Sequence, residues 1–138
     1  MQYDAFIGEV QHRAQLDSRE AALSISRATL TTLSERIEPG EAENIGAQLP
    51  EELGRFLEEV DEVERFGFEE FVDRVAEREE IGEEDPADAA FHAQVVLDVL
   101  AEAVTEGALE DLKTQLPENE GYETLFEIAE QEGSPPDA

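Results

Sequence analysis

A near-repeat at one constant spacing constrains this chain more than any other feature. Residues 33–51 read LSERIEPGEAENIGAQLPE, and residues 100–118 read LAEAVTEGALEDLKTQLPE. The identical pairs at this spacing include Ala22/Ala89, Leu30/Leu97, Leu33/Leu100, Glu35/Glu102, Gly40/Gly107, Glu43/Glu110, Gln48/Gln115, Leu49/Leu116, Pro50/Pro117 and Glu51/Glu118. Upstream, Phe6 and Val10 recur as Phe71 and Val75, at a slightly shorter spacing. Two copies are too few for a solenoid, so we expect a pseudo-symmetric pair packed face to face.

Each copy reads as four helices, which predicts an all-α fold arranged as a compact helical bundle. We predict helices over about 2–15, 18–37, 41–47 and 50–63, with counterparts over about 68–80, 86–105, 107–114 and 118–130. Apolar residues spaced three and four apart give each long helix a buried stripe. We therefore expect a single domain over residues 1–130, made of two repeats (about 1–65 and 66–130), with a disordered polar tail at 131–138.

Helix ends are marked by capping residues, glycines and prolines. Asp17 or Ser18 can cap the second helix, and Asp85 followed by Pro86 caps its counterpart. We expect Gly40 and Gly107 just past a helix end, in the left-handed conformation. Pro50 and Pro117 should hold the preceding leucines extended and start the fourth helices. For residues 66–68, a flexible hinge and a packed linker both remain open.

Charge is the most extreme property of the composition. The chain holds 37 acidic residues against 9 basic ones, a net charge of −28. Its regular apolar spacing argues against disorder, so we interpret the acidity as adaptation to very high salt. At about 1 M salt the Debye length falls to about 3 Å, which screens the self-repulsion of such a surface. A mimic of nucleic acid, with its charge gathered on one face, is the alternative.

Composition also restricts where the protein works. No apolar run approaches the length of about 18 residues that spans a bilayer. The N-terminal residues do not resemble a signal peptide, and there is no cysteine. We therefore expect a cytoplasmic protein without a membrane span. The shortage of Lys and Arg argues against nucleic-acid binding, since affinity for phosphates depends on them.

Candidate sites are few, and each has a simple structural interpretation. In the duplicated Gln-Leu-Pro-Glu segment, Gln48 and Gln115 could frame a shared groove, although we favour a role in the turn. His92 is interpreted as a core or boundary residue, and the role of His12 stays open, because the sequence indicates no carboxylate or nucleophile to orient either one.

Acidic clusters carry no metal-binding pattern. Neither Glu83–Asp85 nor Glu58–Glu64 follows the order of ligands in a calcium loop. No P-loop, dinucleotide-binding, nucleophile-elbow or zinc-protease string occurs. We therefore assign no catalytic, cofactor-binding or metal-binding residue, expect no cofactor, and predict that the protein is not an enzyme.

The combination of these segments resembles a known family. Phe6, Val10, Phe71 and Val75 lead two helical units, and the stretches 33–53 and 100–117 carry the L-x-E-R-I-x-P-G-E-A and A-Q-L-P-E-E-L patterns or their variants. This is similar to the domain of unknown function 2267 family of small, acidic, two-unit helical proteins. The resemblance implies an all-α fold and transfers no catalytic residue.

Three classes of function remain as hypotheses. We favour a helical interaction module that binds a protein or peptide partner, with a groove between the repeats as its site. The alternatives are an acidic mimic of nucleic acid that binds basic proteins, and an enzyme that uses buried carboxylates. Neither the oligomeric state nor the partner follows from the sequence.

Overall fold

The regular elements of the chain are helical throughout the part that the structure describes. A computed structural model describes residues 1–58, 62–79 and 85–126. Its α-helices are α1 (Tyr3–Arg13), α2 (Arg19–Arg36), α3 (Pro39–Ala47), α4 (Glu51–Gly54), α5 (Phe68–Arg78), α6 (Pro86–Ala103) and α7 (Glu106–Gln115). Three 3₁₀ turns complete the set, η1 (Arg55–Leu57), η2 (Glu118–Glu120) and η3 (Tyr122–Phe126). The predicted all-α class is confirmed.

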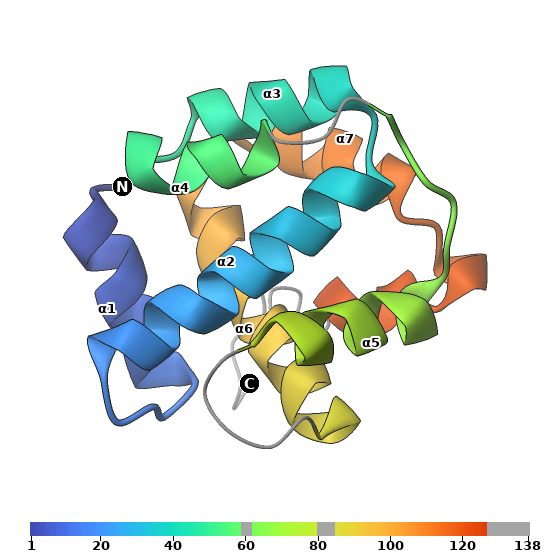
Figure 1. Cartoon of the computed structure of the whole chain (residues 1–138). Coiled ribbons are helices and arrows are strands. Elements are labelled where there is room, and N and C mark those ends of the chain that lie inside the picture. Colours follow the sequence, from blue (N-terminus) through green and yellow to red (C-terminus); the bar gives the residue numbers. More distant parts are fainter. Residues whose placement is uncertain (59–61, 80–84, 127–138) are drawn as a thin grey trace, which may run out of the picture.

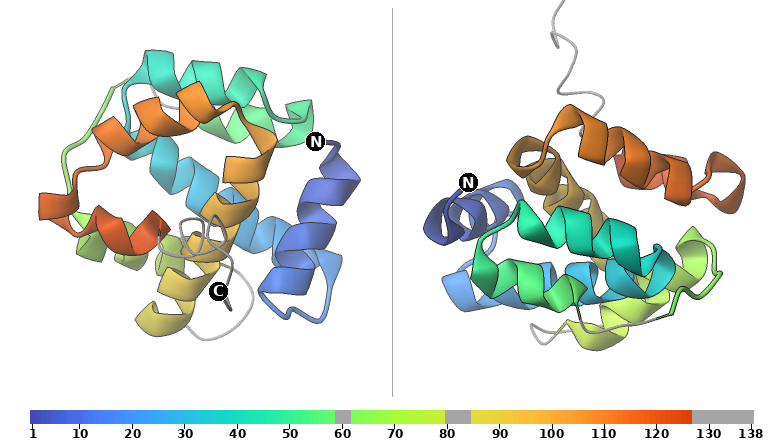
Figure 2. Two further views of the ribbon diagram at one scale, coloured as in Figure 1. Left: turned by 180° about the vertical axis from the view of Figure 1, so that it is seen from behind. Right: turned by 90° about the horizontal axis from the view of Figure 1, so that it is seen from above.

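The two 18-residue helices, α2 and α6, cross through the middle of the molecule (Figure 1). Helix α1 packs against both of them on one side, and α5 packs against both on the other. Helices α3 and α7 lie side by side along one edge, as the view from behind also shows (Figure 2). The central pair α2 and α6 is therefore flanked by α1 on one side and by α5 on the other. The two surface hollows described below lie beside these flanking helices.

Capping explains where the central helices begin. The Ser18 hydroxyl accepts a hydrogen bond from the N–H of Ala21 at 3.1 Å, and Asp85 accepts from the N–H of Ala87 at 2.9 Å. Pro86 occupies the first turn of α6, where its missing N–H leaves no bond unmade. The predicted caps at Ser18 and Asp85 are confirmed.

The predicted apolar stripes form the core. Phe6, Val10, Leu30, Leu33, Ile37, Phe71, Val75, Leu97 and Leu100 are all completely buried. Most of these side chains are aliphatic or phenylalanine, and they come from α1, α2, α5 and α6. Burial of this apolar surface, at about 25 cal/mol per Å², is the main force that holds the four helices together.

The predicted positions of Gly40 and Gly107 were wrong. Helices α2 and α6 end at extended residues, Ile37 and Val104, and not at a left-handed glycine. Both glycines lie instead in the first turn of the next helix, α3 or α7. The residue before Pro39 must be extended, which stops α2 early, while Pro39 itself is well suited to a first helical position.

The predicted helix over 50–63 is much shorter than expected. Helix α4 and turn η1 end at Leu57, and residues 62–67 are not helical. The N–H of Glu64 donates to the carbonyl of Glu35 at 2.8 Å, and Phe66 is only 7% exposed. Tertiary contacts with α2 thus hold this segment extended. Residues 59–61, including the predicted apolar Val60, lie outside the described residues.

Over residues 118–126, the counterpart helix predicted for 118–130 is replaced by η2 and η3, which are separated by a left-handed Gly121 with φ of +91°. In the first half, α3 and α4 approach so closely that a Cβ on Gly54 would lie 2.5 Å from the carbonyl oxygen of Gly46. In the repeat, Lys113 occupies the position that corresponds to Gly46, so the second half lacks the small residue that this approach requires. Residues 127–138, with the predicted tail, lie outside the described residues.

Residues 66–68 form a packed linker and not a hinge. The carbonyl of Phe66 accepts hydrogen bonds from Arg36 Nε at 2.9 Å and from the Tyr122 hydroxyl at 2.7 Å. The ring of Phe68 packs edge-on against Tyr122, with centroids 5.9 Å apart. Both ends of the linker are therefore tied to the core.

Candidate functional site

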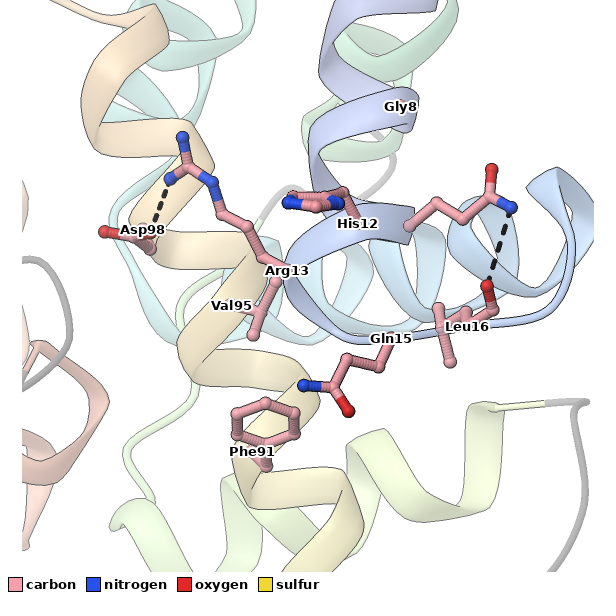
Figure 3. Close-up of a pocket in the computed structure, with 9 residues that line it drawn as sticks. Gly8, His12, Arg13, Gln15, Leu16, Phe91, Val95 and Asp98 are labelled. Atoms are coloured by element: carbon pink, nitrogen blue, oxygen red, sulfur yellow. Dashed lines mark hydrogen bonds and ion pairs between the residues drawn. The ribbon is translucent and has the colours of Figure 1, made fainter.

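A surface hollow of about 800 Å³ lies between α1, the turn that follows it, and α6. We call it the α1/α6 hollow; it is lined by Gly8, Gln11, His12, Arg13, Gln15, Leu16, Phe91, Val95 and Asp98. Figure 3 shows α1 contributing His12 and Arg13 on one side while α6 contributes Phe91, Val95 and Asp98 on the other. Phe91 is 40% exposed, and apart from Met1 it is the one large apolar side chain so exposed among the described residues.

An ion-pair network closes one end of the hollow. Arg13 donates to Asp98 at 2.5 Å and, with both terminal nitrogens, to Glu102 at 2.6 and 3.0 Å. Asp98 is only 2% exposed. The hydrogen bonds to Glu102 raise the pKa of Arg13 above its ordinary value, against the opposing effect of burial. The one carboxylate among the lining residues is therefore matched by a permanent positive charge.

The turn after α1 shapes the other end through an unusual backbone conformation. Gln15 has a φ of +57°, the left-handed region that glycine normally occupies. Its N–H donates to the carbonyl of His12 at 3.2 Å, and the N–H of Leu16 donates to the carbonyl of Gln11 at 3.0 Å. These two bonds make a Schellman motif with glutamine in the glycine position. The conformation turns the chain so that Gln15 and Leu16 line the hollow.

A second hollow, of about 720 Å³, lies between α2, α5 and η1. We call it the α2/α5 hollow; its lining is Glu20, Leu23, Ser24, Arg27, Ala28, Thr31, Arg55, Phe56, Glu77 and Arg78. Three arginines thus gather around one space, in a chain that has only 9 basic residues. Arg78 is engaged by Glu35, with two bonds of 2.7 Å.

The glutamines of the two Gln-Leu-Pro-Glu segments, Gln48 and Gln115, each bond to the backbone of the opposite half of the chain. Gln48 Oε1 accepts a hydrogen bond from the N–H of Thr105 at 2.8 Å, and Gln115 Oε1 accepts one from the N–H of Glu38 at 2.8 Å. Thr105 and Glu38 are the residues that precede α7 and α3. Leu49 and Leu116 are buried. Both glutamine oxygens therefore hold the helix starts together, in agreement with a structural role for the segment.

The two histidines lie in different surroundings. His12 is exposed on α1 and lines the α1/α6 hollow. His92 Nδ1 lies 2.8 Å from Glu79 Oε2, and the side chains of the two residues are 12% and 7% exposed. The sequence indicated no carboxylate partner for His92, because Glu79 lies at the end of α5 and reaches α6 only in the folded chain.

The acidic clusters do not form a metal site within residues 1–58, 62–79 and 85–126. No group of three or more potential ligands is placed to hold an ion among these residues. Asp85 caps α6, and Glu64 pairs with Arg74 at 3.2 Å. Glu59, Asp61, Glu83 and Glu84 lie outside the described residues. None of the helices in the described residues has the length and apolar character to cross a bilayer.

Sequence reasoning missed the residues that define the two hollows. Phe91 resembles any helix position next to a core stripe, and only the folded structure shows that its ring stays at the surface beside α1. Arg27 and Arg55 are far apart in the sequence and meet only because η1 packs on α2. The two available signals were an aromatic residue next to the apolar stripe of α6 and arginines in a chain poor in bases.

In the described residues, fold and surface together define a small, acidic, helical protein that carries the α1/α6 and α2/α5 hollows and has no metal-binding cluster. Residues 3–125 match the family model described as an uncharacterized conserved protein, DUF2267. Because the match extends over most of the chain, the protein belongs to the DUF2267 family. The comparison with curated proteins gives no match.

Proposed function

We propose that this protein is a non-enzymatic interaction module that binds a protein partner through the α1/α6 hollow. The observation that carries the proposal is the exposure of Phe91 beside a neutral, half-apolar hollow on a chain with a net charge of −28. Aromatic side chains at the edge of a concave surface are typical anchors of protein interfaces. An apolar side chain of the partner would fill the hollow.

The lining supports an apolar ligand group. Phe91 and Leu16 offer apolar surface above the buried Val95, and Gln11 and Gln15 offer uncharged donors and acceptors. The lining also contains one ion pair, in which Arg13 and Asp98 neutralise each other. An incoming apolar group would therefore displace water from carbon and amide surface without stripping water from an unpaired charge, which is the costly step in binding.

We infer that the chain consists of two copies of one unit packed about a pseudo-two-fold axis. The central helices α2 and α6 have the same length, and so do the flanking helices α1 and α5. Arg13 bonds to Glu102 with both terminal nitrogens, as Arg78 does to Glu35. Reciprocal contacts of this kind are typical of a two-fold interface.

On this correspondence the two hollows are counterparts whose chemistry differs. Phe91 and Val95 of the first take the places of Ser24 and Ala28 in the second. If these positions served only to build the fold, we would expect similar residues in the two hollows. The presence of an exposed aromatic ring at only one of these two positions supports a role in binding.

We also propose that the protein works in a cytoplasm of very high salt. The support is the excess of 37 acidic over 9 basic residues, which destabilises a compact state through self-repulsion unless salt screens it. The free energy of unfolding should rise between about 0.1 M and 1 M KCl, as the Debye length falls from about 10 Å to about 3 Å. A stability that falls or stays level over this range would contradict the proposal.

An enzyme that uses buried carboxylates is less well supported. Asp98 is buried and lines the hollow, but it accepts a short hydrogen bond from Arg13. A general base needs a free carboxylate or imidazole within reach of the substrate, and His12 does offer an exposed imidazole in this hollow. Among the described residues, however, no carboxylate or nucleophile bonds to the His12 ring to orient it for catalysis. We therefore favour binding over chemistry at this position.

The proposal is tested by a pull-down from native extract held at multimolar KCl, with the wild type and Phe91→Ser compared. Serine is the residue at the corresponding position of the second hollow, Ser24. We expect one stoichiometric protein with the wild type and its loss with Phe91→Ser. A control is Ala47→Ser, because Ala47 is an exposed residue of α3 that lines neither hollow. Equal capture by wild type and Phe91→Ser, or no capture by folded wild type, would refute the proposal.

A further inference from the structure

Two arginines of the α2/α5 hollow converge on one aromatic ring. The guanidinium carbons of Arg27, on α2, and Arg55, on η1, each lie 5.9 Å from the centroid of the Phe56 ring. This distance is within the range of a cation–π contact. Both arginines are exposed, and Phe56 is 9% exposed. Two positive charges are thus held at the edge of a concave surface with an apolar base.

These arginines differ from the others in the chain. Each of the others contacts at least one carboxylate within 4.0 Å, namely Arg13, Arg19, Arg36, Arg65, Arg74 and Arg78. No carboxylate of the described residues pairs with Arg27 or Arg55. In a chain with 37 acidic residues, pairing is the expected outcome for an exposed arginine. The pair is therefore available to a ligand that brings its own negative charge.

We propose that the α2/α5 hollow is a binding site for a small organic monocarboxylate with an apolar or aromatic body. A guanidinium presents its N–H groups in a planar fork that matches a carboxylate, so Arg27 and Arg55 would hold the anionic end. The body would pack on Leu23, Ala28 and Phe56, which line the same space.

The rest of the lining restricts the charge of the ligand. Glu20 and Glu77 are exposed at the rim, and Arg78 is already neutralised by Glu35. The local balance is thus two cations against two carboxylates, and these neighbouring charges still act on a bound ligand at about 1 M salt, which screens the rest of the chain. A phosphate dianion would be repelled more than a carboxylate of single charge. This argument favours a monocarboxylate over a phosphate ester.

The site is tested by NMR titration of the whole chain at about 1 M salt, where long-range repulsion is screened. The probes are benzoate, its neutral analogue benzamide, and phenyl phosphate. We expect saturable shifts with benzoate at Ser24, Arg27, Thr31 and Arg55, and about tenfold or greater weakening in the Arg27→Gln/Arg55→Gln double variant. The matched control, Arg19→Gln, removes an exposed arginine that pairs with Asp4 outside the hollow, and should bind benzoate as the wild type does.

Each other outcome would overturn the proposal. An absence of saturable shifts with benzoate, or unchanged affinity in the double variant, would exclude Arg27 and Arg55 as a carboxylate site. Equal binding of benzamide would show that the ring alone is recognised, and tighter binding of phenyl phosphate would exclude the monocarboxylate class. The proposal is independent of the interaction at Phe91, which lies on α6 in the other hollow.

Discussion

Gln48 Oε1, in the first half of the chain, lies 2.8 Å from the backbone nitrogen of Thr105, the residue that caps α7 in the second half. The same bond recurs in the other direction between Gln115 and Glu38, the residue before α3. Each glutamine thus satisfies a backbone N–H at the start of a helix that belongs to the other half. The two Gln-Leu-Pro-Glu segments link the halves through these bonds.

We predict that Gln48→Ala and Gln115→Ala each lower the free energy of unfolding by about 1 kcal/mol, because each leaves one backbone N–H without its partner. If the halves are related by pseudo-symmetry, the two losses should be similar. Chemical denaturation in high salt measures both. A large loss for one variant and none for the other would contradict an equivalent role of the two glutamines.

Arg36 is the most deeply buried charged residue in the described part of the chain, at 1% exposure. It donates to the carbonyl of Phe66 at 2.9 Å and to Glu120 at 2.6 Å, and its guanidinium carbon lies 5.4 Å from the centroid of the Tyr122 ring. Burial raises the pKa of Tyr122 to about 12, although Arg36 opposes the rise. The arginine thus ties the 66–68 linker and η2 to α2.

We predict that Arg36→Ala lowers the free energy of unfolding by about 3 kcal/mol, because it removes several bonds and leaves a cavity. Arg65→Ala is the control, since Arg65 is exposed and lies 3.9 Å from Glu38. That change should cost less than about 1 kcal/mol. Similar losses for the two variants in denaturant titrations would refute the tethering role of Arg36.

We predict that Gln15→Gly stabilises the protein by about 0.5–1 kcal/mol, because a side chain disfavours the left-handed backbone that glycine adopts freely. The φ of Gln15 is +57°. Gln15→Ala is the matched control and should bring no gain, because alanine also carries a Cβ. Thermal unfolding of the three proteins decides the point, and a loss of stability in Gln15→Gly would show that the side chain itself stabilises the turn.

The pH dependence of stability should involve Glu35. Burial alone would raise its pKa, but hydrogen bonds from Arg78 and Arg74 outweigh burial and lower the pKa below the ordinary value of 4.5. A carboxyl with a lowered folded-state pKa adds stability above its unfolded pKa and loses this contribution as the pH falls through the folded pKa. The benefit of Glu35 is thus complete near neutral pH and disappears in acid.

Glu35→Gln should therefore be less stable than the wild type at neutral pH, and the difference should shrink steadily as the pH falls below 4.5. Denaturant titrations of both proteins across this range measure the difference. A difference that stays constant from neutral to acidic pH would show that Glu35 acts by packing and not by charge.

Much of the fold follows from local patterns in the sequence. The stripes through Leu30 and Leu97 and the caps at Ser18 and Asp85 were predicted correctly, because spacing and capping act within a few residues along the chain. Gly40 was assigned wrongly because a glycine beside a proline marks a boundary without showing whether a helix ends or begins there.

The fourth helices and the hollows depend on tertiary contacts that a sequence pattern does not reveal. The helix predicted over 50–63 runs past Leu57, but the bond from Glu64 to Glu35 and the burial of Phe66 hold residues 62–67 in a non-helical conformation. The 40% exposure of Phe91 depends on how the helices pack together, which local spacing does not show. Arg27 likewise reaches the Phe56 ring, which it shares with Arg55, only after η1 has packed on α2.

The most direct test of the proposed function is photo-crosslinking from position 91. A photoreactive phenylalanine analogue replaces Phe91 in one protein and Ala47, an exposed residue of α3, in another, and both are irradiated in native extract at multimolar KCl. We predict that position 91 alone forms a crosslink to a single protein, and that the crosslinked residue of that partner is apolar. Identical products from both positions, or no product from position 91 in the folded protein, would contradict binding through the α1/α6 hollow.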